Sequence, residues 1–451
     1  MDTNKPKLLF LTQDDPLDKK AWSGTLYHMH HQLSKYFEVT NTGPIPHLTG
    51  FWKLAFNVFA SINHRVFHKY YDINHSKLIG RLNLKKIKDK VYGDYDFIYA
   101  PIASRELSQV KNLKTPVIYA SDITFDLIKE KYGFEMLYKF SFKEGDDVER
   151  LAIKKATYCL YPSEWAANSA INKYSAKPEK VLIIPLGANI SHLPEYDVTA
   201  KTNFNTLEIL FLGVDWVRKG GDIVLNTYRK LKEHNFDVHL TICGCVPPVD
   251  LTDSDITVIS FLDKNNPKDY EKFNQLLIDT HLLFVPSEAE AYGIVFCEAA
   301  AYGIPVITRD VGGISSIVKN NVNGYCLPYD STLDAYFETL STIVTNNELY
   351  KTLSTASRKL YSDSLSWDRW GEKVSNIMKD HLRNLLTQNG QFKLLDTTQK
   401  NQTTLEFYKQ QLGDRETQIK LGYLTDGLLI TLDITNPKTP GHNAEQVEYF
   451  Y

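Results

Sequence analysis

The chain has 451 residues, of which 43% are hydrophobic and 23% are charged, the balance of a soluble globular protein. A single hydrophobic core rarely extends beyond about 250–300 residues, so this length predicts two domains of ordinary size. The formal net charge of −3 argues against wholesale nucleic-acid binding, and we expect no nucleic-acid partner.

The start of the chain and its cysteines bear on its location. The first five residues lead directly into an apolar run, and no uncharged run approaches the length of a membrane-spanning helix. We therefore expect a cytoplasmic protein without a secretory signal. The cysteines are odd in number and lie in apolar contexts, which favours reduced, buried thiols. They are Cys159, Cys243, Cys245, Cys297 and Cys326.

Short apolar runs alternate with helical stretches along both halves of the chain. Such alternation predicts parallel sheets with helices on both faces. In the first half the predicted strands are 7–12, 97–100, 117–120, 158–161 and 181–184. In the second half they are 207–213, 238–243, 256–259, 282–285 and 305–308. We therefore expect an α/β protein with two Rossmann-like, doubly wound parallel-sheet domains that face a central cleft.

The same pattern predicts the domain limits. The first domain is expected over 1–190 and the second over 205–365, with a polar linker between them. A helix over 366–390 is expected to cross back to the first domain. The extension 391–451 begins with amide-rich sequence and contains a predicted helix over 403–421. It is compatible with an ordered appendage, an oligomerisation arm or a partly disordered tail.

The most informative segment of the second half is 286–306. Pro286 stops an apolar strand, Tyr292-Gly293 opens a helical stretch, and Gly303 ends it. A helix that begins at the carboxyl end of a parallel strand aims its free N–H groups into the ligand crevice. The segment therefore predicts a site for a phosphate or a sugar hydroxyl.

Two acids flank this predicted site. Glu290 falls in the loop before the helix, and Glu298 falls inside the helix among apolar residues. A buried glutamate needs partners, which ligand hydroxyls would supply. The alternative is an ordinary strand-to-helix unit with one surface glutamate and one buried, ion-paired glutamate.

A basic, glycine-containing turn follows the first strand of the second half. It contains Arg218, Lys219, Gly220 and Gly221 in sequence. Arginine offers a forked donor, lysine a point charge, and glycines allow a ligand to approach the backbone. The turn therefore predicts a diphosphate site, and its structural alternative is a basic turn before a surface helix.

The first half has weaker signals at corresponding places. Small residues around Gly24 stand at a predicted helix start, where a phosphate or sugar would lie against the backbone. Asp122 follows the predicted strand 117–120 and would face the cleft opposite Glu290. Both features are also compatible with helix capping alone.

Together these residues resemble the retaining glycosyltransferases of family 4. The resemblance rests on Glu-x7-Glu, with Glu290 inside Pro-Ser-x-x-Glu-x-Tyr-Gly-Ile and Glu298 in the Glu-Ala that follows, on Gly-Ile-Pro-Val, and on Arg218-Lys219-Gly220. It covers 7–385. It implies the GT-B fold, with a nucleotide-sugar donor bound mainly by the second domain and a carbohydrate or lipid-linked acceptor bound mainly by the first.

The resemblance also implies roles for individual residues. Arg218 and Lys219 would neutralise the departing diphosphate, Glu298 would bind the ribose hydroxyls, and Glu290 would meet the donor sugar on its reacting face. Backbone N–H groups of the helix start would hold the sugar or phosphate. The implied donor-binding set is Gly24, Arg218, Lys219, Tyr292, Gly293, Ile294 and Glu298, and the implied catalytic set is Glu290, Asp122, Arg218 and Lys219.

The chain departs from the family at two positions. Many members carry a histidine where this chain has Asp122, which leaves open whether the aspartate contacts the donor sugar. Members also often have a further acid where this chain reads Gly312-Gly313-Ile314-Ser315-Ser316.

No metal or other cofactor is expected. The Asp-x-Asp at 253–255 falls in a loop before a strand, whereas a divalent ion would need such acids at a strand end. Two protein cations and helix N-termini can stabilise the leaving-group charge instead. Two rival functions remain: a sugar-nucleotide epimerase or hydrolase, and a non-catalytic nucleotide-sugar-binding subunit.

One further segment concerns partners. Residues 51–90 contain nine Lys or Arg against two acids, with many aromatics among them. A basic, aromatic helix pair in the acceptor domain would bind an anionic membrane surface or a lipid-linked or polyanionic acceptor. The structural alternative is a pair of surface helices whose aromatics belong to the core.

Overall fold

The computed structural model describes residues 5–45, 67–131, 137–191 and 205–388, three strands between 417 and 450, and single residues at 58, 65 and 193. The chain divides into two compact units, Met1–Lys379 and Asp380–Tyr451. The first unit contains two six-stranded sheets, and the second contains one three-stranded sheet.

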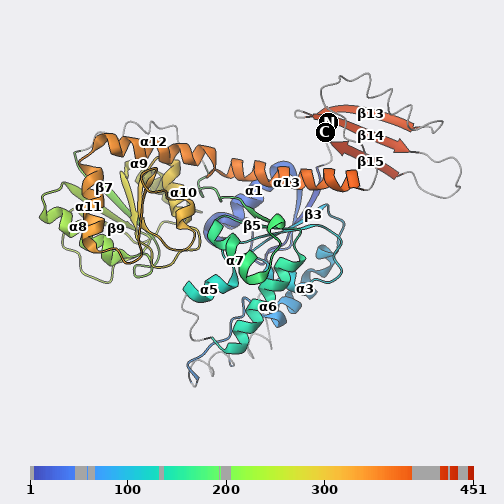
Figure 1. The fold of residues 1–451 in the computed structure, drawn as a ribbon, viewed down its shortest axis with the longest axis horizontal. Helices are drawn as coiled ribbons and strands as arrows, with labels where there is room; N and C mark the ends of the chain where they lie inside the picture. The colour runs from blue at the N-terminus through green and yellow to red at the C-terminus, as the bar shows by residue number, and fades with distance from the viewer. Residues whose placement is uncertain are drawn as a thin grey trace. The chain divides into compact units, whose positions relative to one another are not determined.

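The first sheet is parallel throughout, in the order β2-β1-β3-β4-β5-β6. Its strands are β1 (Lys7–Phe10), β2 (Glu38–Asn41), β3 (Phe97–Pro101), β4 (Val117–Ala120), β5 (Tyr158–Tyr161) and β6 (Val181–Ile183). The accompanying helices are α1 (Thr25–Tyr36), α3 (Lys77–Val91), α4 (Ser104–Gln109), α5 (Phe125–Lys131), α6 (Lys139–Lys155) and α7 (Glu164–Tyr174). Figure 1 shows these elements as one α/β layer structure.

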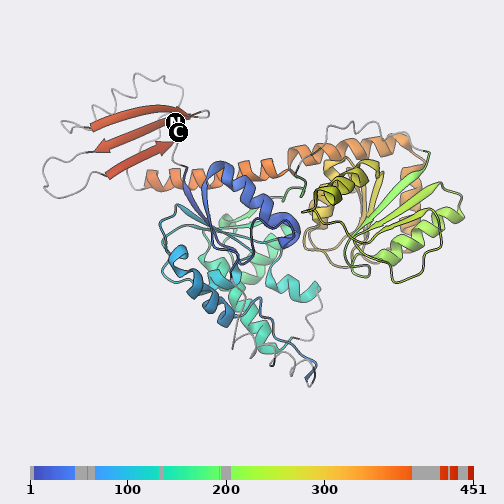
Figure 2. The ribbon, with the colours of Figure 1, turned by 180° about the vertical axis from the view of Figure 1, so that it is seen from behind.

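The second sheet is also parallel, in the order β12-β11-β10-β7-β8-β9. Its strands are β7 (Leu207–Leu212), β8 (Val238–Cys243), β9 (Ile256–Ile259), β10 (Leu282–Val285), β11 (Val306–Arg309) and β12 (Gly324–Leu327). The helices are α8 (Gly221–Glu233), α9 (Pro267–Asp279), α10 (Ile294–Ala301), α11 (Leu333–Val344), α12 (Asn347–Asp363) and α13 (Trp367–Gln388). In both views α8 and α11 pack together, and α10 packs with α12 (Figures 1 and 2).

The predicted fold class is confirmed, but two strands were missed. β2 (EVTN) and β12 (GYCL) are the outermost strands of their sheets, and neither is fully buried. A central parallel strand covered on both faces reads as a continuous apolar run, as β4 (VIYA) does. β2 is largely polar and β12 begins with a glycine, so hydrophobic pattern did not identify them, whereas the other two edge strands, β6 (VLI) and β9 (ITVI), were predicted.

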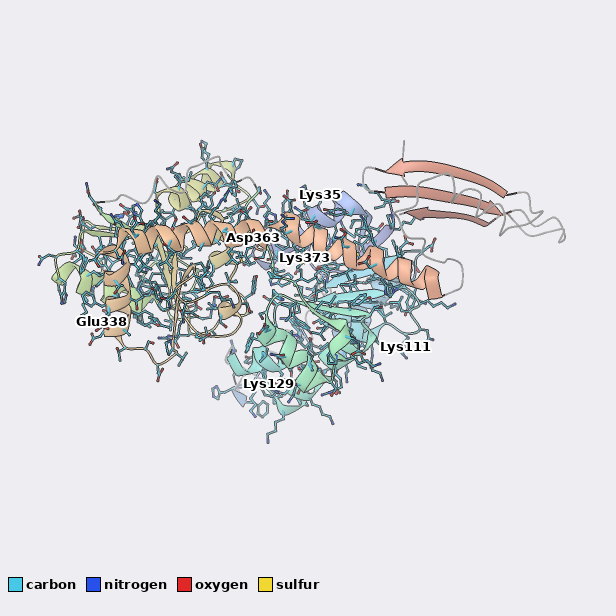
Figure 3. The ribbon with its side chains drawn as sticks, turned by 45° about the horizontal axis from the view of Figure 1, so that its top comes forward. Lys35, Lys111, Lys129, Glu338, Asp363 and Lys373 are labelled. Atoms are coloured by element: carbon cyan, nitrogen blue, oxygen red, sulfur yellow. The ribbon has the colours of Figure 1, made fainter. Side chains whose placement is uncertain are left out.

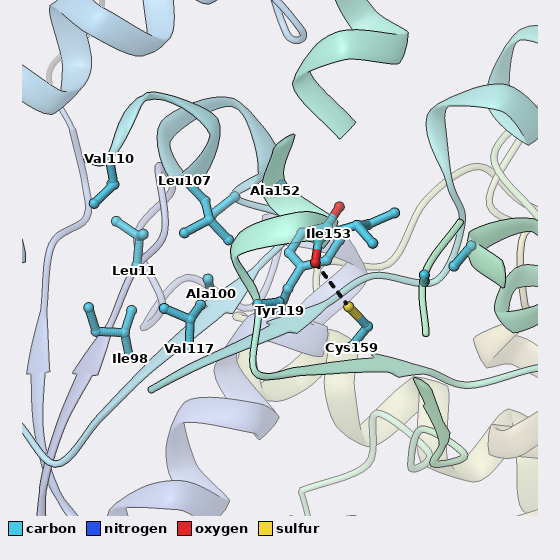
Figure 4. Packing of buried hydrophobic residues seen from close by; sticks show 14 of the residues in the cluster. Leu11, Ile98, Ala100, Leu107, Val110, Val117, Tyr119, Ala152, Ile153 and Cys159 are labelled. Carbon is cyan, nitrogen blue, oxygen red and sulfur yellow. Dashed lines mark hydrogen bonds between the residues drawn. The ribbon is translucent and has the colours of Figure 1, made fainter. Parts of the chain in front are cut away.

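The core of the first domain packs between its sheet and the helices α3, α4, α6 and α7 (Figure 4). Cys159 lies within it, with its thiol directed at the Ile153 carbonyl, 3.9 Å away. Burial raises the pKa of this thiol to about 12, so it behaves as a small apolar side chain. All five cysteines are free thiols, and Cys245 is the partly exposed one.

The start of α13 returns to the first domain. Trp367 Nε1 donates to Asn189 Oδ1 at 3.0 Å, and Gln32 Nε2 of α1 donates to Asp368 Oδ1 at 3.0 Å. Trp370 packs edge-on against Tyr99 of β3, with the ring centroids 5.9 Å apart. Figure 3 shows α13 passing beside α1.

The three-stranded sheet of the second unit is antiparallel, in the order β13-β14-β15. Its strands are β13 (Thr417–Leu424), β14 (Gly427–Ile434) and β15 (Glu445–Phe450). The predicted helix 403–421 is therefore wrong over 417–421. The alternation of apolar residues in this stretch has the period of a strand, and Leu421 pairs with Ile430 in the ladder. The part over 403–416 lies outside the described residues.

The helices of the described part include none that is both long and apolar enough to cross a membrane. Of the basic segment 51–90, the structure describes α3 and the stretch leading to it from 67. The first helix of the predicted pair lies outside the described residues.

A buried acid lies behind β4 in the first domain. Tyr119 donates its hydroxyl hydrogen toward Glu149 of α6, 3.1 Å from each carboxylate oxygen. Burial raises the pKa of Glu149 to about 7, while His75, Tyr119 and Ser104 favour its charged form and Asp146 opposes it. This acid therefore takes up a proton more readily in the folded protein than in the unfolded chain.

The consequence is a pH-dependent contribution to folding. Because the pKa is raised in the folded state, the contribution is full below the unfolded value and is lost as the pH rises to about 7. Glu149→Gln removes this loss and keeps an acceptor for Tyr119. The unfolding free energy of the variant minus that of wild type should increase by about 2 kcal/mol from pH 5 to pH 8, measured by urea denaturation. Exposed Glu179→Gln should show no such change, and a pH-independent difference for Glu149→Gln would contradict the account.

Candidate functional site

The second sheet reverses its strand order between β7 and β10, which are neighbours. In open α/β sheets, ligands bind at the carboxyl ends of the strands where the order reverses. The loops after these two strands carry the basic turn and the acidic loop predicted from the sequence. The topology therefore places both predicted motifs at one position of the sheet edge.

Glycines let the basic turn lie close to its neighbours. Gly220 has φ +77°, and a Cβ atom there would lie 2.3 Å from the Pro286 carbonyl oxygen. A Cβ atom on Gly221, the first residue of α8, would lie 2.2 Å from the Trp216 ring. The Glu288 N–H donates to the Arg218 carbonyl at 2.7 Å and joins the two loops. A larger residue at Gly220 would separate the loops, and one at Gly221 would displace Trp216 within the basic turn.

Three predicted site residues meet where the loops join. Lys219 forms an ion pair with Glu290, and both side chains are largely buried. Arg218 Nη1 donates to the Ala289 carbonyl at 3.2 Å and lies 3.9 Å from the same Glu290 oxygen. Two cations and one carboxylate thus form a compact cluster. Such a cluster can exchange its internal pairing for contacts to a bound anion.

A second ion pair, which the sequence did not predict, fixes the acidic loop. Arg309 at the end of β11 donates to Glu288 at 2.5 Å, and Tyr329 donates to the other Glu288 oxygen at 2.6 Å. Arg309 is buried, and its guanidinium also lies over the Tyr329 ring, 4.8 Å from the centroid. A sequence feature that could have indicated this ion pair is the position of Glu288 inside the motif around Glu290.

The helix α10 begins at Ile294, so the predicted start at Tyr292-Gly293 is two residues early. Gly293 has φ +98°, a left-handed conformation that ends the loop and caps the helix. The first N–H groups of α10 have no partners within the helix and remain suitable for a ligand. The Tyr292 side chain belongs to the core, and burial raises the pKa of its hydroxyl. Only its backbone is suited to the predicted role.

Glu298 has a protein partner. It is buried in α10, and Lys264 donates to its Oε1 at 2.5 Å. Burial raises the pKa of Glu298, and the Lys264 charge opposes that rise. The Lys264 ammonium lies over the Phe273 ring, 4.2 Å from its centroid. The ion-paired alternative considered for Glu298 is therefore what the structure contains. A carboxylate has about four acceptor positions, so this contact does not saturate it.

In the first domain, the loop before α1 has an unusual backbone. Trp22, Ser23 and Gly24 adopt left-handed φ values of 47°, 57° and 92° in succession. Non-glycine residues in this region each cost of order 1–3 kcal/mol and persist where their surroundings hold them. Asn189 holds the turn by donating to the Ser23 carbonyl at 2.7 Å. The side chain of Trp22 in turn donates to Asp122 Oδ2 at 3.2 Å.

Asp122 faces the acidic loop of the second domain. Burial raises its pKa to about 6, and the negative charge of Glu290 adds to this rise. Next to Asp122, Ile123 and Leu127 pack with Ala291 of the acidic loop in one apolar cluster. The two predicted acids therefore lie near enough to interact across the domain boundary.

Both aspartates of the Asp-x-Asp at 253–255 have protein partners. Tyr228 donates to Asp253 at 2.9 Å, and Lys232 pairs with Asp255 at 2.6 Å. Among the described residues, no group of three or more His, Cys, Asp or Glu side chains could hold a metal ion.

Comparison with known proteins agrees with this geometry. Residues 198–360 match the family model for glycosyl transferases group 1. A probable sucrose-phosphate synthase of Thermosipho melanesiensis is 23% identical over 269 residues, 56% of this chain and 61% of that protein. The chain thus matches less than two thirds of that relative's length.

Solved structures show the same architecture. Sucrose-phosphate synthase from Thermosynechococcus elongatus has a TM-score of 0.60 at 15% identity, covering 84% of this chain and 100% of that one. Anabaena HepE, solved in complex with UDP and glucose, has a TM-score of 0.55 at 14% identity, covering 83% of this chain and 99% of that one. The chain has the GT-B fold.

The contact between Gly312 and the acidic loop gives a test of the site's geometry. Gly312 has φ +59°, and a Cβ atom there would lie 1.8 Å from the Glu290 carbonyl oxygen. Gly312→Ala should therefore displace the loop and cost about 2 kcal/mol or more, measured as the free energy of unfolding in urea. Gly371→Ala is the control, since its nearest atom would lie 3.1 Å away, in the Gln32 side chain. Equal stabilities for the two variants would refute the close approach.

Proposed function

We propose that this chain is a retaining glycosyltransferase that moves a sugar from a nucleoside-diphosphate donor to a hydroxyl acceptor, in polysaccharide or glycoconjugate assembly. The observation that carries the proposal is the cluster of Arg218, Lys219 and Glu290 at the strand-order reversal of the second sheet. The match of 198–360 to glycosyl transferases group 1 supports it.

The donor diphosphate would bind to the basic turn. Lys219 would exchange its contact with Glu290 for a phosphate oxygen, and Arg218 would donate from its fork. As the bond to the sugar breaks, negative charge grows on the leaving diphosphate, and these fixed cations stabilise it. The free N–H groups of α10 add to this stabilisation. The proposed mechanism therefore needs no metal ion.

The nucleoside would extend from the diphosphate toward Glu298. A ribose hydroxyl can donate to the carboxylate while Lys264 keeps its own contact. Gly24, at the start of α1, would line the phosphate side from the first domain. The HepE complex contains UDP, so uridine donors are the first choice for assay.

The acceptor would enter from the first domain. Retention requires the acceptor hydroxyl to attack from the face that the diphosphate leaves. The phosphate oxygen released from the sugar can accept the proton of that hydroxyl. Glu290 and Asp122 would orient the transferred sugar by accepting hydrogen bonds from its hydroxyls. Glu290 in this role binds the donor and does not act in a glycosidase-type acid–base pair.

The test is acceptor-dependent transfer. The full-length protein is incubated in EDTA with UDP-sugars and a panel of carbohydrate and lipid-linked acceptors, and the anomeric configuration of the product is determined by NMR. A product with the donor's configuration is expected. Release of nucleoside diphosphate into water alone would favour an epimerase or hydrolase, and donor binding without release would favour a binding subunit. Oligomerisation through 391–451 and a cytoplasmic location stay predictions.

The donor roles predict opposite effects for the two partners of the central ion pair. Lys219→Met should weaken binding of both UDP and the UDP-sugar by about 10–100-fold, because a phosphate contact is lost. Glu290→Gln should leave UDP binding unchanged or tighter, because a negative charge beside the diphosphate is removed, and should abolish the extra affinity contributed by the sugar. Isothermal titration calorimetry measures both, with exposed Lys359→Met as the control. Weaker UDP binding in Glu290→Gln would exclude this arrangement.

The raised pKa of Asp122 predicts a pH profile. The ionised form accepts hydrogen bonds from sugar hydroxyls, so kcat/KM should fall as the pH drops through about 6. Asp122→Asn should show a lower kcat/KM without this acidic limb, while its amide oxygen can still accept from Trp22. An unchanged limb in Asp122→Asn would assign the titration to another group.

A further inference from the structure

Two segments of the first domain form an exposed aromatic surface. The stretch 67–73 leads to α3, and 137–143 begins α6. They are joined by an isolated parallel β-bridge between Tyr70 and Leu137. A hydrogen bond of 3.2 Å runs from the Tyr138 N–H to the Tyr70 carbonyl. Both lie at the end of the domain where α6 begins (Figures 1 and 2).

Three aromatic side chains of this surface stack on one another, and two phenylalanines remain exposed. The Phe140 ring stacks on Tyr138 and Tyr71, with centroids 5.2 and 5.8 Å away. Yet 55% of Phe140 is exposed, as is 59% of Phe67. Ile73 and Leu78 nearby along the chain are exposed as well. A group of large exposed apolar side chains marks a binding surface more often than chance.

The charges around these rings are unevenly placed. The acid within these segments and the acid that follows the second one are engaged internally. Asp72 pairs with His75 at 2.6 Å, and the Tyr71 hydroxyl donates to Glu144 at 2.5 Å. The cations are exposed instead, at Lys69, Lys139 and Lys143. Among the residues of this surface that the structure describes, the outward charge is therefore positive.

Lys139 is also placed against the helix dipole. It is the first residue of α6, and no acid lies in that turn. A cation at a helix N-terminus is unfavourable, whereas an anion there is stabilised. The neighbouring Phe140 exposes to water an apolar ring that would be more stable if it were buried. Both features weaken the free protein and favour a partner that is anionic and has an apolar interior.

We propose that this surface, formed by Phe67, Lys69, Lys139, Phe140 and Lys143, docks on an anionic membrane. Aromatic rings would enter the headgroup region while the lysines meet lipid phosphates at the membrane surface. Phe67 and Lys69 belong to the basic segment recognised in the sequence; the aromatic and basic start of α6 does not. The docking is independent of donor chemistry.

The experiment is vesicle co-sedimentation of the full-length protein at 0.1 M salt. One vesicle type is pure phosphatidylcholine, and the other contains phosphatidylglycerol. Binding to the anionic vesicles alone is expected, and it should weaken at 0.5 M salt because surface charges are screened. Lys69→Glu/Lys139→Glu/Lys143→Glu should reduce the partition coefficient at least about 100-fold. Phe140→Ser should also reduce it.

Matched variants separate this surface from others. Lys351→Glu/Lys359→Glu/Lys373→Glu and Val322→Ser change exposed residues of the same kinds elsewhere and should bind normally. Circular dichroism and UDP binding verify that each variant is folded, and failure to bind UDP would count against the proposed function only.

Three outcomes would overturn the docking proposal. The first is absence of binding to anionic vesicles by the wild-type protein. The second is normal vesicle binding by the Lys69/Lys139/Lys143 variant together with loss in Lys85→Glu/Lys86→Glu/Lys88→Glu, which would move the contact to α3. The third is a dimer in sedimentation velocity that Phe140→Ser dissociates, which would assign the surface to self-association.

Discussion

The candidate site depends on the ion pair between Lys219 and Glu290. Both side chains are largely buried, and removing two charges from water costs free energy that their mutual attraction only partly repays. Such a pair adds little to stability, yet it holds a cation at the strand-order reversal before any ligand arrives. A diphosphate carries more charge than one carboxylate, so it can take over the lysine. The site is thus prepared for an anion without leaving a buried charge unpaired.

The surrounding backbone keeps this pair in place. The Glu288 N–H and the Arg218 carbonyl join the two loops, and Arg309 holds the Glu288 side chain from a third strand. Gly312 allows its own loop to touch the Glu290 carbonyl. Three neighbouring strands therefore contribute to the position of one carboxylate. This shared support explains why the loop between β10 and α10 has a fixed course although it lacks regular structure.

Local sequence was sufficient for the central strands and for the motif residues that meet after β7 and β10. It failed where partners come from afar. Lys264 lies 34 residues before Glu298, and no local pattern connects them. The left-handed conformation of Trp22 and Ser23 is equally hidden, because only glycine signals that region. The edge strands β2 and β12 escaped detection because β2 is largely polar and β12 begins with a glycine, while the more apolar edge strands β6 and β9 were found.

Under the proposed function, the two facing acids would restrict the sugar that fits between the domains. Burial raises the pKa of Asp122 most, and the negative charge of Glu290 adds to this rise, so the two carboxylates repel each other. A ring bearing several neutral hydroxyls can donate to both carboxylates and so replace water without adding charge. A sugar acid would add a third carboxylate to this space and would be repelled. A histidine, which many glycosyltransferases of family 4 have at the corresponding position, can donate as well as accept, whereas an ionised aspartate only accepts. The presence of Asp122 in place of a histidine would therefore favour a neutral donor sugar with a free hydroxyl directed at the first domain.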